Sequence, residues 1–190
     1  MRRLELSDAG GGQATLALGG LPARLAAVDL AASRRLQAAA GTMARRLACA
    51  IGRLGDGWIW LAVAAALPLL GTPSTAREAL VDMVVVFSLG LPLYKTLKRA
   101  TARVRPCHAP GGLSALAPPL DRFSFPSGHT LHAVAMTVVL VGHHPALAWV
   151  LVPFALLTAL SRIVLGLHYP TDVLAGAGLG ALIALVARAL

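Results

Sequence analysis

Charged side chains are scarce in this sequence, and acids are the scarcest of them. Only 13% of the 190 residues are charged and 57% are apolar, whereas an ordinary soluble domain has about 25% charged and about 45–50% apolar residues. The composition excludes a disordered or collagen-like chain and argues against a soluble globular domain. It indicates an integral membrane protein built as one compact domain.

Acids and cysteines are too few for the common metal sites. The second half of the chain holds only two acids, Asp121 and Asp172, and a two-metal phosphatase needs more ligands than that. The two cysteines, Cys49 and Cys107, define neither a disulfide framework nor a zinc motif. We therefore expect a site that uses no metal and no cofactor.

Basic residues give the chain a formal net charge of +9. In a soluble protein this excess would indicate nucleic-acid binding. In so apolar a chain, we interpret it first as charge for a membrane surface or for an anion site. No nucleic-acid partner is expected.

The N-terminal part of the chain differs from the rest. Residues 1–20 are polar and then glycine-rich, which predicts a flexible tail. Residues 21–54 have apolar side chains every three or four positions and arginines mostly between them, which predicts an amphipathic helix lying in the membrane interface. A surface helix packed on the domain is the alternative. Gly41 and Thr42 are expected to break this helix.

The remaining residues, 55–190, predict a membrane-embedded domain. A spanning helix needs about 20 apolar residues, with a range of about 17–25. The expected fold is therefore an all-α helical bundle with about five transmembrane helices, formed by the apolar stretches 57–72, 79–97, 127–142, 146–165 and 172–190. Gly176, Gly178 and Gly180 in the last stretch permit close helix approach and also allow a homodimer.

Polar residues gather in three clusters, at residues 98–106, 125–130 and 161–172. The first cluster ends the second span, the next begins the third, and the last joins the fourth span to the fifth. The number of spans between them therefore places all three clusters at one membrane face. Polar groups within a membrane domain are costly, which indicates a functional role.

All three clusters carry groups of an anion site. Lys98, Arg105 and Arg162 supply positive charge suited to phosphate. Ser127 follows a proline and is a plausible N-cap, and with Gly128 it predicts a helix N-terminus that attracts anions.

Histidines and one carboxylate complete the chemistry. His129 and His168 exchange protons near neutral pH. Asp172 follows His168 by four residues and can accept a hydrogen bond from Nδ1–H, which fixes the tautomer and leaves Nε2 free as a nucleophile. These groups predict metal-free phosphoryl transfer, in which positive side chains take the role of a metal.

The three motifs together resemble the type 2 phosphatidic acid phosphatase superfamily. They read Lys-x6-Arg-Pro from Lys98, Pro-Ser-Gly-His ending at His129, and Ser-Arg-x5-His-x3-Asp ending at Asp172. The resemblance covers residues 79–190. It implies a phosphohistidine on His168 oriented by Asp172, with His129 as acid and then base. Lys98, Arg105, Ser127, Gly128 and Arg162 would bind phosphate.

The substrate implied by the resemblance is a lipid phosphate or diphosphate in a bacterial inner membrane. Phosphatidic acid, phosphatidylglycerophosphate and undecaprenyl diphosphate represent this class. The alternatives are a catalytically inactive lipid-phosphate-binding or scaffold protein, and a vanadate-dependent haloperoxidase-like enzyme.

Two features of the sequence disagree about which face of the membrane carries the site. Eight arginines against four acids in residues 1–57 would place the N-terminal segment in the cytoplasm. The resemblance implies a periplasmic site, and this is the face we expect.

Four further residues receive ordinary structural interpretations from the sequence. Asp56 lies between two glycines and is interpreted as a turn or cap residue. His132 is interpreted as a packing residue. Arg103 and Arg122 are interpreted as solvated loop residues, or as residues that draw anionic headgroups towards the site.

Overall fold

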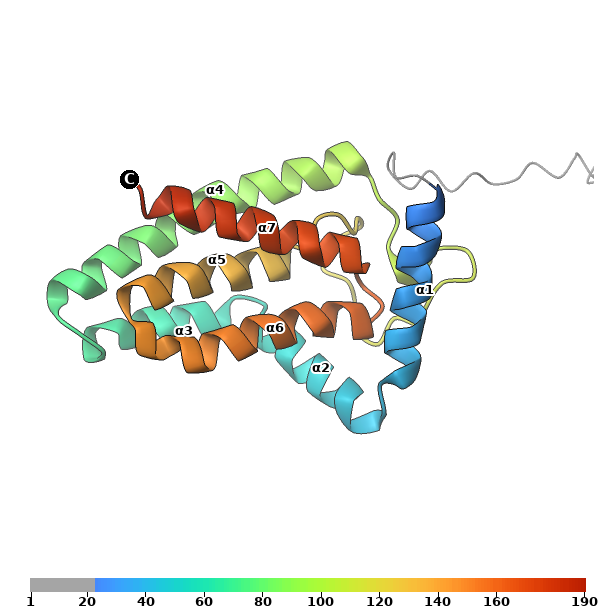
Figure 1. Ribbon diagram of the computed structural model, residues 1–190, viewed down its shortest axis with the longest axis horizontal. Coiled ribbons are helices and arrows are strands. Elements are labelled where there is room, and N and C mark those ends of the chain that lie inside the picture. The colour runs from blue at the N-terminus through green and yellow to red at the C-terminus, as the bar shows by residue number, and fades with distance from the viewer. Residues whose placement is uncertain (1–22) are drawn as a thin grey trace, which may run out of the picture.

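The computed structural model describes residues 23–190, and these residues form helices and connecting segments without a β-strand. One isolated bridge pairs Val104 with Phe123. The predicted all-α class is confirmed, whereas the predictions for residues 1–20 lie outside the described residues. In chain order the α-helices are α1 (Ala23–Ala39), α2 (Thr42–Leu54), α3 (Trp58–Ala66), α4 (Pro73–Thr101), α5 (Gly128–His143), α6 (Ala148–Val164) and α7 (Pro170–Ala187), as Figure 1 shows.

Helices α1 and α2 occupy the segment predicted as one amphipathic helix. The chain leaves the helical conformation at Gly41, whose backbone is extended with φ −69° and ψ 173°, so the predicted break is confirmed. Arg45 bridges it, since its Nε donates to the carbonyl of Ala40 at 2.9 Å and its Nη2 to that of Gln37 at 3.1 Å. These bonds satisfy carbonyls that the end of α1 leaves unpaired. Helix α1 lies across one end of the bundle (Figure 1).

Helix α4 is the longest helix in the described part of the chain. Thr72 caps its start by accepting a hydrogen bond from the N–H of Thr75, and Pro73 occupies the first turn, where its missing N–H costs nothing. The helix ends because Ala102 adopts a left-handed conformation with φ 47°, and its N–H donates to the carbonyl of Lys98. This ending places Lys98 in the last turn.

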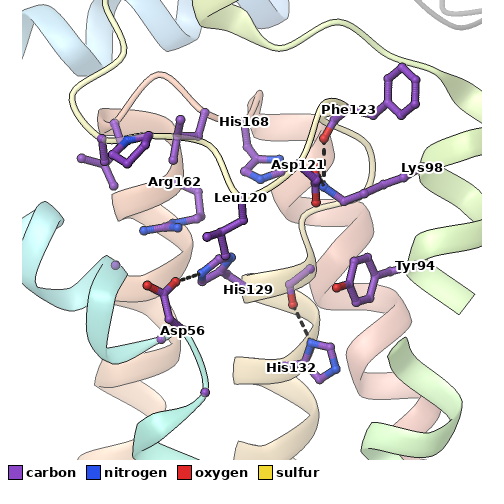
Figure 2. Close-up of a pocket in the computed structure, with 18 of the residues that line it drawn as sticks. Asp56, Tyr94, Lys98, Leu120, Asp121, Phe123, His129, His132, Arg162 and His168 are labelled. Atoms are coloured by element: carbon purple, nitrogen blue, oxygen red, sulfur yellow. Dashed lines mark hydrogen bonds and ion pairs between the residues drawn. The ribbon is translucent and has the colours of Figure 1, made fainter. Parts of the chain in front are cut away.

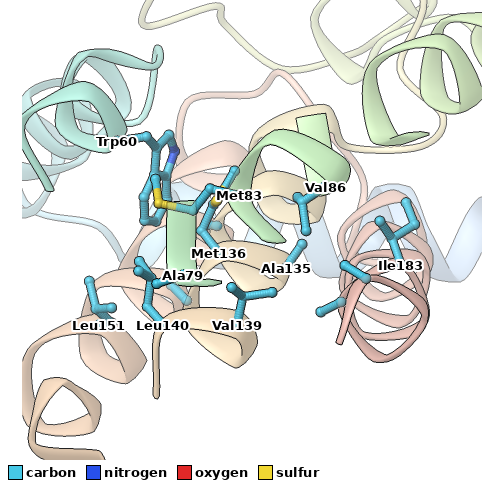
Figure 3. Packing of buried hydrophobic residues seen from close by; sticks show 14 of the residues in the cluster. Trp60, Ala79, Met83, Val86, Ala135, Met136, Val139, Leu140, Leu151 and Ile183 are labelled. Carbon is cyan, nitrogen blue, oxygen red and sulfur yellow. The ribbon is translucent and has the colours of Figure 1, made fainter. Parts of the chain in front are cut away.

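Helix α5 forms the centre of the bundle. It packs against α4, α6 and α7, and its inward side chains meet those of α3 and α4 in one apolar core (Figure 3). The largest fully buried members of this core are Trp60, Leu67, Leu131, Met136 and Leu140.

Two glycines of α7 allow the close contact with α5. A Cβ on Gly176 would lie 2.5 Å from the carbonyl oxygen of Ser127, and one on Gly180 would lie 2.3 Å from that of Leu131. Any larger residue would therefore push the two helices apart. The small-residue stripe thus serves packing within the chain, and the homodimer stays a prediction.

All five apolar stretches contain helix, but not all are long enough to cross a membrane alone. Within the described residues, three helical segments pass by length and apolarity: Pro73–Thr101, Pro145–Val164 and Pro170–Ala187. Thr42–Leu54 and Trp58–Leu69 pass only as a pair, bent by 62°, which allows up to four spans. The expected number was about five. The difference arises because α3 has nine residues and α5 has sixteen.

The outer surface of the bundle is apolar. Large hydrophobic side chains on α3, α4, α6 and α7 point away from the core and are exposed. Such a surface is unfavourable in water and suits the hydrocarbon of a bilayer. Prominent examples are Leu61, Val84, Trp149, Leu156, Leu174 and Leu185.

Candidate active site

The three polar clusters meet around one cavity at the end of the bundle where α1 lies. The cavity has a volume of about 720 Å³, which is within the usual range of ligand sites. Figure 2 shows side chains reaching it from α4, α5, α6 and the connecting segments. Six of the eight residues predicted from the sequence line it: Lys98, Arg105, Gly128, His129, Arg162 and His168.

Backbone hydrogen bonds hold the three motifs together. The N–H of Ser127 donates to the carbonyl of Asp172 at 3.0 Å, joining the second motif to the third. The N–H of Cys107 donates to the carbonyl of Gly166 at 3.1 Å, joining the first to the third. The long connection between α4 and α5 is thus tied to the loop that carries His168.

His168 is held in a defined tautomer. Its side chain is 3% exposed, and its Nε2 lies 3.2 Å from Nη1 of Arg105. Because a guanidinium only donates, Nε2 must be the acceptor, and the proton of the neutral ring sits on Nδ1. Nδ1 lies 3.6 Å from Oδ2 of Asp172, beyond hydrogen-bond distance. The lone pair of Nε2, the atom that would attack as a nucleophile, therefore points towards Arg105 at the wall of the cavity.

The environment keeps His168 uncharged at neutral pH. Burial lowers the pKa of its imidazole most, Asp172 opposes this effect and the positive charge of Arg105 adds to it, with the result that the pKa is about 4. A neutral imidazole retains the lone pair that attacks phosphorus.

Asp172 lies behind His168 rather than in the cavity wall. It is fully buried in the first turn of α7. Its Oδ2 accepts the backbone N–H of Tyr169 at 2.8 Å, and its Oδ1 accepts Nη1 of Arg103 at 2.5 Å. These bonds leave Oδ2 facing Nδ1 of His168 at 3.6 Å, so the predicted hydrogen bond is not formed in this structure, and the orienting role of Asp172 stays a prediction.

Asp121 pairs with two of the predicted phosphate ligands. Its Oδ1 accepts Nζ of Lys98 at 2.9 Å and Nη2 of Arg105 at 2.6 Å. Burial would raise the pKa of this carboxyl, but the hydrogen bond from Lys98 and the charges of Lys98 and Arg105 lower it below its usual value. Two predicted phosphate ligands thus already bind one anionic oxygen. The sequence offered no reason to place Asp121 here.

Arg162 supplies a third positive charge. It is 4% exposed and lies in the last turn of α6, and its Nε donates to the hydroxyl of Ser161 at 3.3 Å. Its guanidinium passes so close to α2 that a Cβ on Gly52 would lie 2.0 Å from Nη2. The absence of a side chain at Gly52 in α2 therefore leaves room for the guanidinium of Arg162.

His129 points into the cavity from the first turn of α5. Its Nε2 lies 2.7 Å from Oδ1 of Asp56, in the turn between α2 and α3 (Figure 2). Asp56 does lie in a turn, as the sequence predicted, but it also orients this ring. A carboxylate partner on a histidine is the usual device for fixing its tautomer.

Ser127 and His132 have local structural contacts. The Ser127 side chain is fully buried, caps α5 by accepting the N–H of Thr130, and does not line the cavity. The predicted N-cap is confirmed, whereas phosphate binding by Ser127 stays a prediction. His132 lines the cavity and stacks on Phe87, with ring centroids 5.0 Å apart.

Arg103 contradicts its sequence interpretation. It is 1% exposed rather than solvated, and it pairs with two buried carboxylates. Its partners, Asp29 and Asp172, lie 74 and 69 residues away in the chain. No local pattern indicates pairing over such separations.

The residues around the cavity are not those of a common metal centre. Across residues 23–190, no group of three or more His, Cys, Asp or Glu side chains is arranged to hold a metal ion. The site offers an anion a set of fixed positive charges instead.

Comparison with known proteins gives consistent matches. The PAP2 superfamily profile matches residues 79–190. An undecaprenyl-diphosphatase of Sulfolobus acidocaldarius is 30% identical over 131 residues, covering 68% of this chain and 62% of the relative. A decaprenylphosphoryl-5-phosphoribose phosphatase of Mycolicibacterium smegmatis is 37% identical over 127 residues, covering 66% and 65%. The chain thus spans less than two thirds of these two relatives.

A solved structure agrees over most of the chain. The transmembrane PAP2-type phosphatidylglycerolphosphate phosphatase of Bacillus subtilis superposes with a TM-score of 0.71 and 28% sequence identity, covering 92% of this chain and 89% of that one. This overlap and the apolar helices indicate a multi-pass membrane protein.

Proposed function

The chain belongs to the PAP2 superfamily, and from that premise we propose that it is a metal-independent phosphatase of membrane lipid phosphates or diphosphates. One observation carries the proposal. The neutral His168, with the carboxylate of Asp172 behind it, opens into a cavity that holds Lys98, Arg105 and Arg162.

Phosphoryl transfer would proceed in two steps, transfer to His168 and then hydrolysis. Nε2 of His168 attacks phosphorus as the bond to the leaving oxygen breaks, and His129, in its imidazolium form beside the carboxylate of Asp56, donates a proton to that oxygen and becomes neutral. Water then attacks the phosphohistidine, His129 accepts its proton, and the N–P bond breaks to release phosphate. Lys98, Arg105 and Arg162 would stabilise the charge on the phosphoryl oxygens in both steps.

The shape of the cavity supports a lipid substrate. Its wall extends from the cationic residues onto an apolar surface of α3 and α4, formed by Trp60, Phe87 and Leu91. A phosphate headgroup would bind at the cations while the start of its lipid tail contacts this surface. The named relatives are an undecaprenyl-diphosphatase and a decaprenylphosphoryl-5-phosphoribose phosphatase, which favours a lipid phosphate or diphosphate here.

The proposal includes two points of placement. We propose the extracytoplasmic face of a bacterial inner membrane for the cavity. We also propose that α1 and α2 lie in the interface beside it, because α2 has arginines on one side and apolar residues on the other.

Phosphate release from purified protein in detergent with EDTA tests the proposed activity. The substrates are phosphatidic acid, phosphatidylglycerophosphate and undecaprenyl diphosphate. A water-soluble phosphate monoester is the control that shows whether a lipid tail is required. We expect release from at least one lipid, at a rate that EDTA leaves unchanged.

Two results would contradict the proposed activity. Release that stops with EDTA would show that a metal takes part. Absence of release by folded protein from every lipid would reject the phosphatase. Lipid-phosphate binding and vanadate-dependent bromide oxidation would then be measured.

Asp121→Asn is expected to tighten the binding of inorganic phosphate by about tenfold. The carboxylate competes with phosphate for Lys98 and Arg105, and a hydrogen bond to a charged group contributes about 1.5–3 kcal/mol. Titration calorimetry with inorganic phosphate measures the Kd. Asp82→Asn, in α4 and paired with His143, is the control that should leave it unchanged. Equal or weaker binding by Asp121→Asn would show that Asp121 does not occupy the phosphate position.

A further inference from the structure

Arg103 joins α1 to the carboxylate behind His168. Its Nη2 donates to Oδ2 of Asp29 at 2.6 Å and its Nη1 to Oδ1 of Asp172 at 2.5 Å. Its guanidinium also lies over the ring of Tyr169, 4.1 Å from the centroid. All three charged side chains are at most 3% exposed. Asp29 lies in a helix that none of the three family motifs includes.

Asp29 also fixes the start of α7. Its Oδ1 accepts the backbone N–H of Thr171 at 3.1 Å, and its Oδ2 accepts the Thr171 hydroxyl. Thr171 immediately precedes Asp172, so α1 holds the turn from which Asp172 faces His168. The same hydroxyl accepts Nη1 of Arg103 at 2.7 Å.

The buried cluster is not electrically neutral. Two carboxylates and one guanidinium leave one negative charge in excess, and buried charges are expensive unless they are compensated. The nearest group that can gain positive charge is His168, whose Nδ1 lies 3.6 Å from Asp172. Other titratable groups face this histidine from further elements: Arg105 contacts Nε2, and Lys98 contributes positive charge from α4.

We propose that Asp29 and Arg103 are positioning residues for the phosphoryl-transfer step, acting through Asp172. Arg103 keeps Asp172 aimed at Nδ1. The negative charge of Asp29 neutralises the positive charge of Arg103. The ion pair with Arg103 therefore does not cancel the negative charge of Asp172. The excess negative charge then stabilises the imidazole ring as it becomes positive on accepting the phosphoryl group. This inference rests on the nucleophilic role proposed for His168.

The competing explanation is that Asp29 only docks α1. Gln37 provides the matched control, because it also docks α1 but contacts no member of the cluster. Its Nε2 donates to the carbonyls of Ser114 and Val164, each at 2.9 Å. Gln37→Ala therefore loosens the same helix without changing the charge near Asp172.

The test compares Asp29→Asn with Gln37→Ala in full-length protein in detergent. With the lipid substrate that is turned over, we expect Asp29→Asn to lower kcat about tenfold with KM within about twofold, since Asp29 does not touch the cavity. Gln37→Ala should leave both constants unchanged. Equal losses of kcat in the two variants would overturn the proposal in favour of simple docking.

A second readout does not depend on turnover, so it separates this inference from the proposed activity. In protein labelled with ¹³C-histidine, the titration of the His168 ring is assigned by its absence in His168→Ala. Removing a buried negative charge should lower the pKa of His168 by about one unit in Asp29→Asn. An unchanged pKa would reject the charge argument even in a protein that releases phosphate.

A double variant covers the case in which Asp29→Asn fails to fold. Asp29→Asn with Arg103→Gln removes one charge of each sign and leaves Asp172 as the single charge of this three-residue cluster. We expect the pKa of His168 to stay within a few tenths of the wild-type value, while kcat stays low because Asp172 is no longer held. Wild-type kcat in this variant would show that neither residue positions Asp172.

Discussion

His168→Ala is expected to lower kcat for phosphate release by about 10⁴-fold or more. Nε2 of His168 carries the lone pair of the neutral ring at the wall of the cavity, and the carboxylate of Asp172 lies 3.6 Å from Nδ1 on the other side of the ring. A nucleophile and the groups that orient it contribute jointly to the rate, so removing the nucleophile alone loses nearly all of the rate enhancement that they give together. Steady-state phosphate release from the preferred lipid measures the effect.

The control for this variant is His108→Ala. His108 is exposed, adjoins the first motif in sequence and does not line the cavity. It should retain wild-type kcat and KM. Activity of His168→Ala within tenfold of the wild type would mean that another group attacks phosphorus.

Arg105→Ala is expected to lower kcat/KM by about 10²–10³-fold. Within residues 23–190, only the Arg105 side chain contacts both His168 Nε2, at 3.2 Å, and Asp121 Oδ1, at 2.6 Å. Loss of one donor that stabilises developing charge typically costs this much. Kinetics with the same lipid substrate provide the measurement.

Two further variants make the Arg105 result specific. Arg77→Ala removes an exposed arginine from the opposite end of α4 and should have no effect on kcat/KM. Arg105→Lys keeps the charge but loses the planar fork, so it should recover only part of the activity. A loss for Arg105→Ala of less than tenfold would remove Arg105 from the phosphate site.

The sequence predicted the site well where local pattern and the number of spans determine the structure. Apolar runs identified the helices, and the alternation of their directions brought Lys98, His129 and His168 to one cavity. Ser127 was predicted as an N-cap because a proline precedes it and an apolar run follows, and it caps α5.

The sequence predicted less where partners come from distant segments. Arg103 was interpreted as solvated because it lies in a polar connection, yet Asp29 and Asp172 bury it. Asp121 and Asp56 likewise acquire their contacts only when separate loops meet at the cavity. The number of spans was also uncertain, because core helices such as α5 are apolar without being long.

The most direct test of the central claim is to trap the phosphorylated protein. Wild-type protein is mixed with its lipid substrate in EDTA, quenched within the first turnover at alkaline pH, digested and analysed by mass spectrometry. We expect one added phosphoryl group on the peptide that contains His168, and none in His168→Ala. A phosphoryl group on another residue, or rapid phosphate release with no phosphorylated peptide at any quench time, would contradict catalysis through His168.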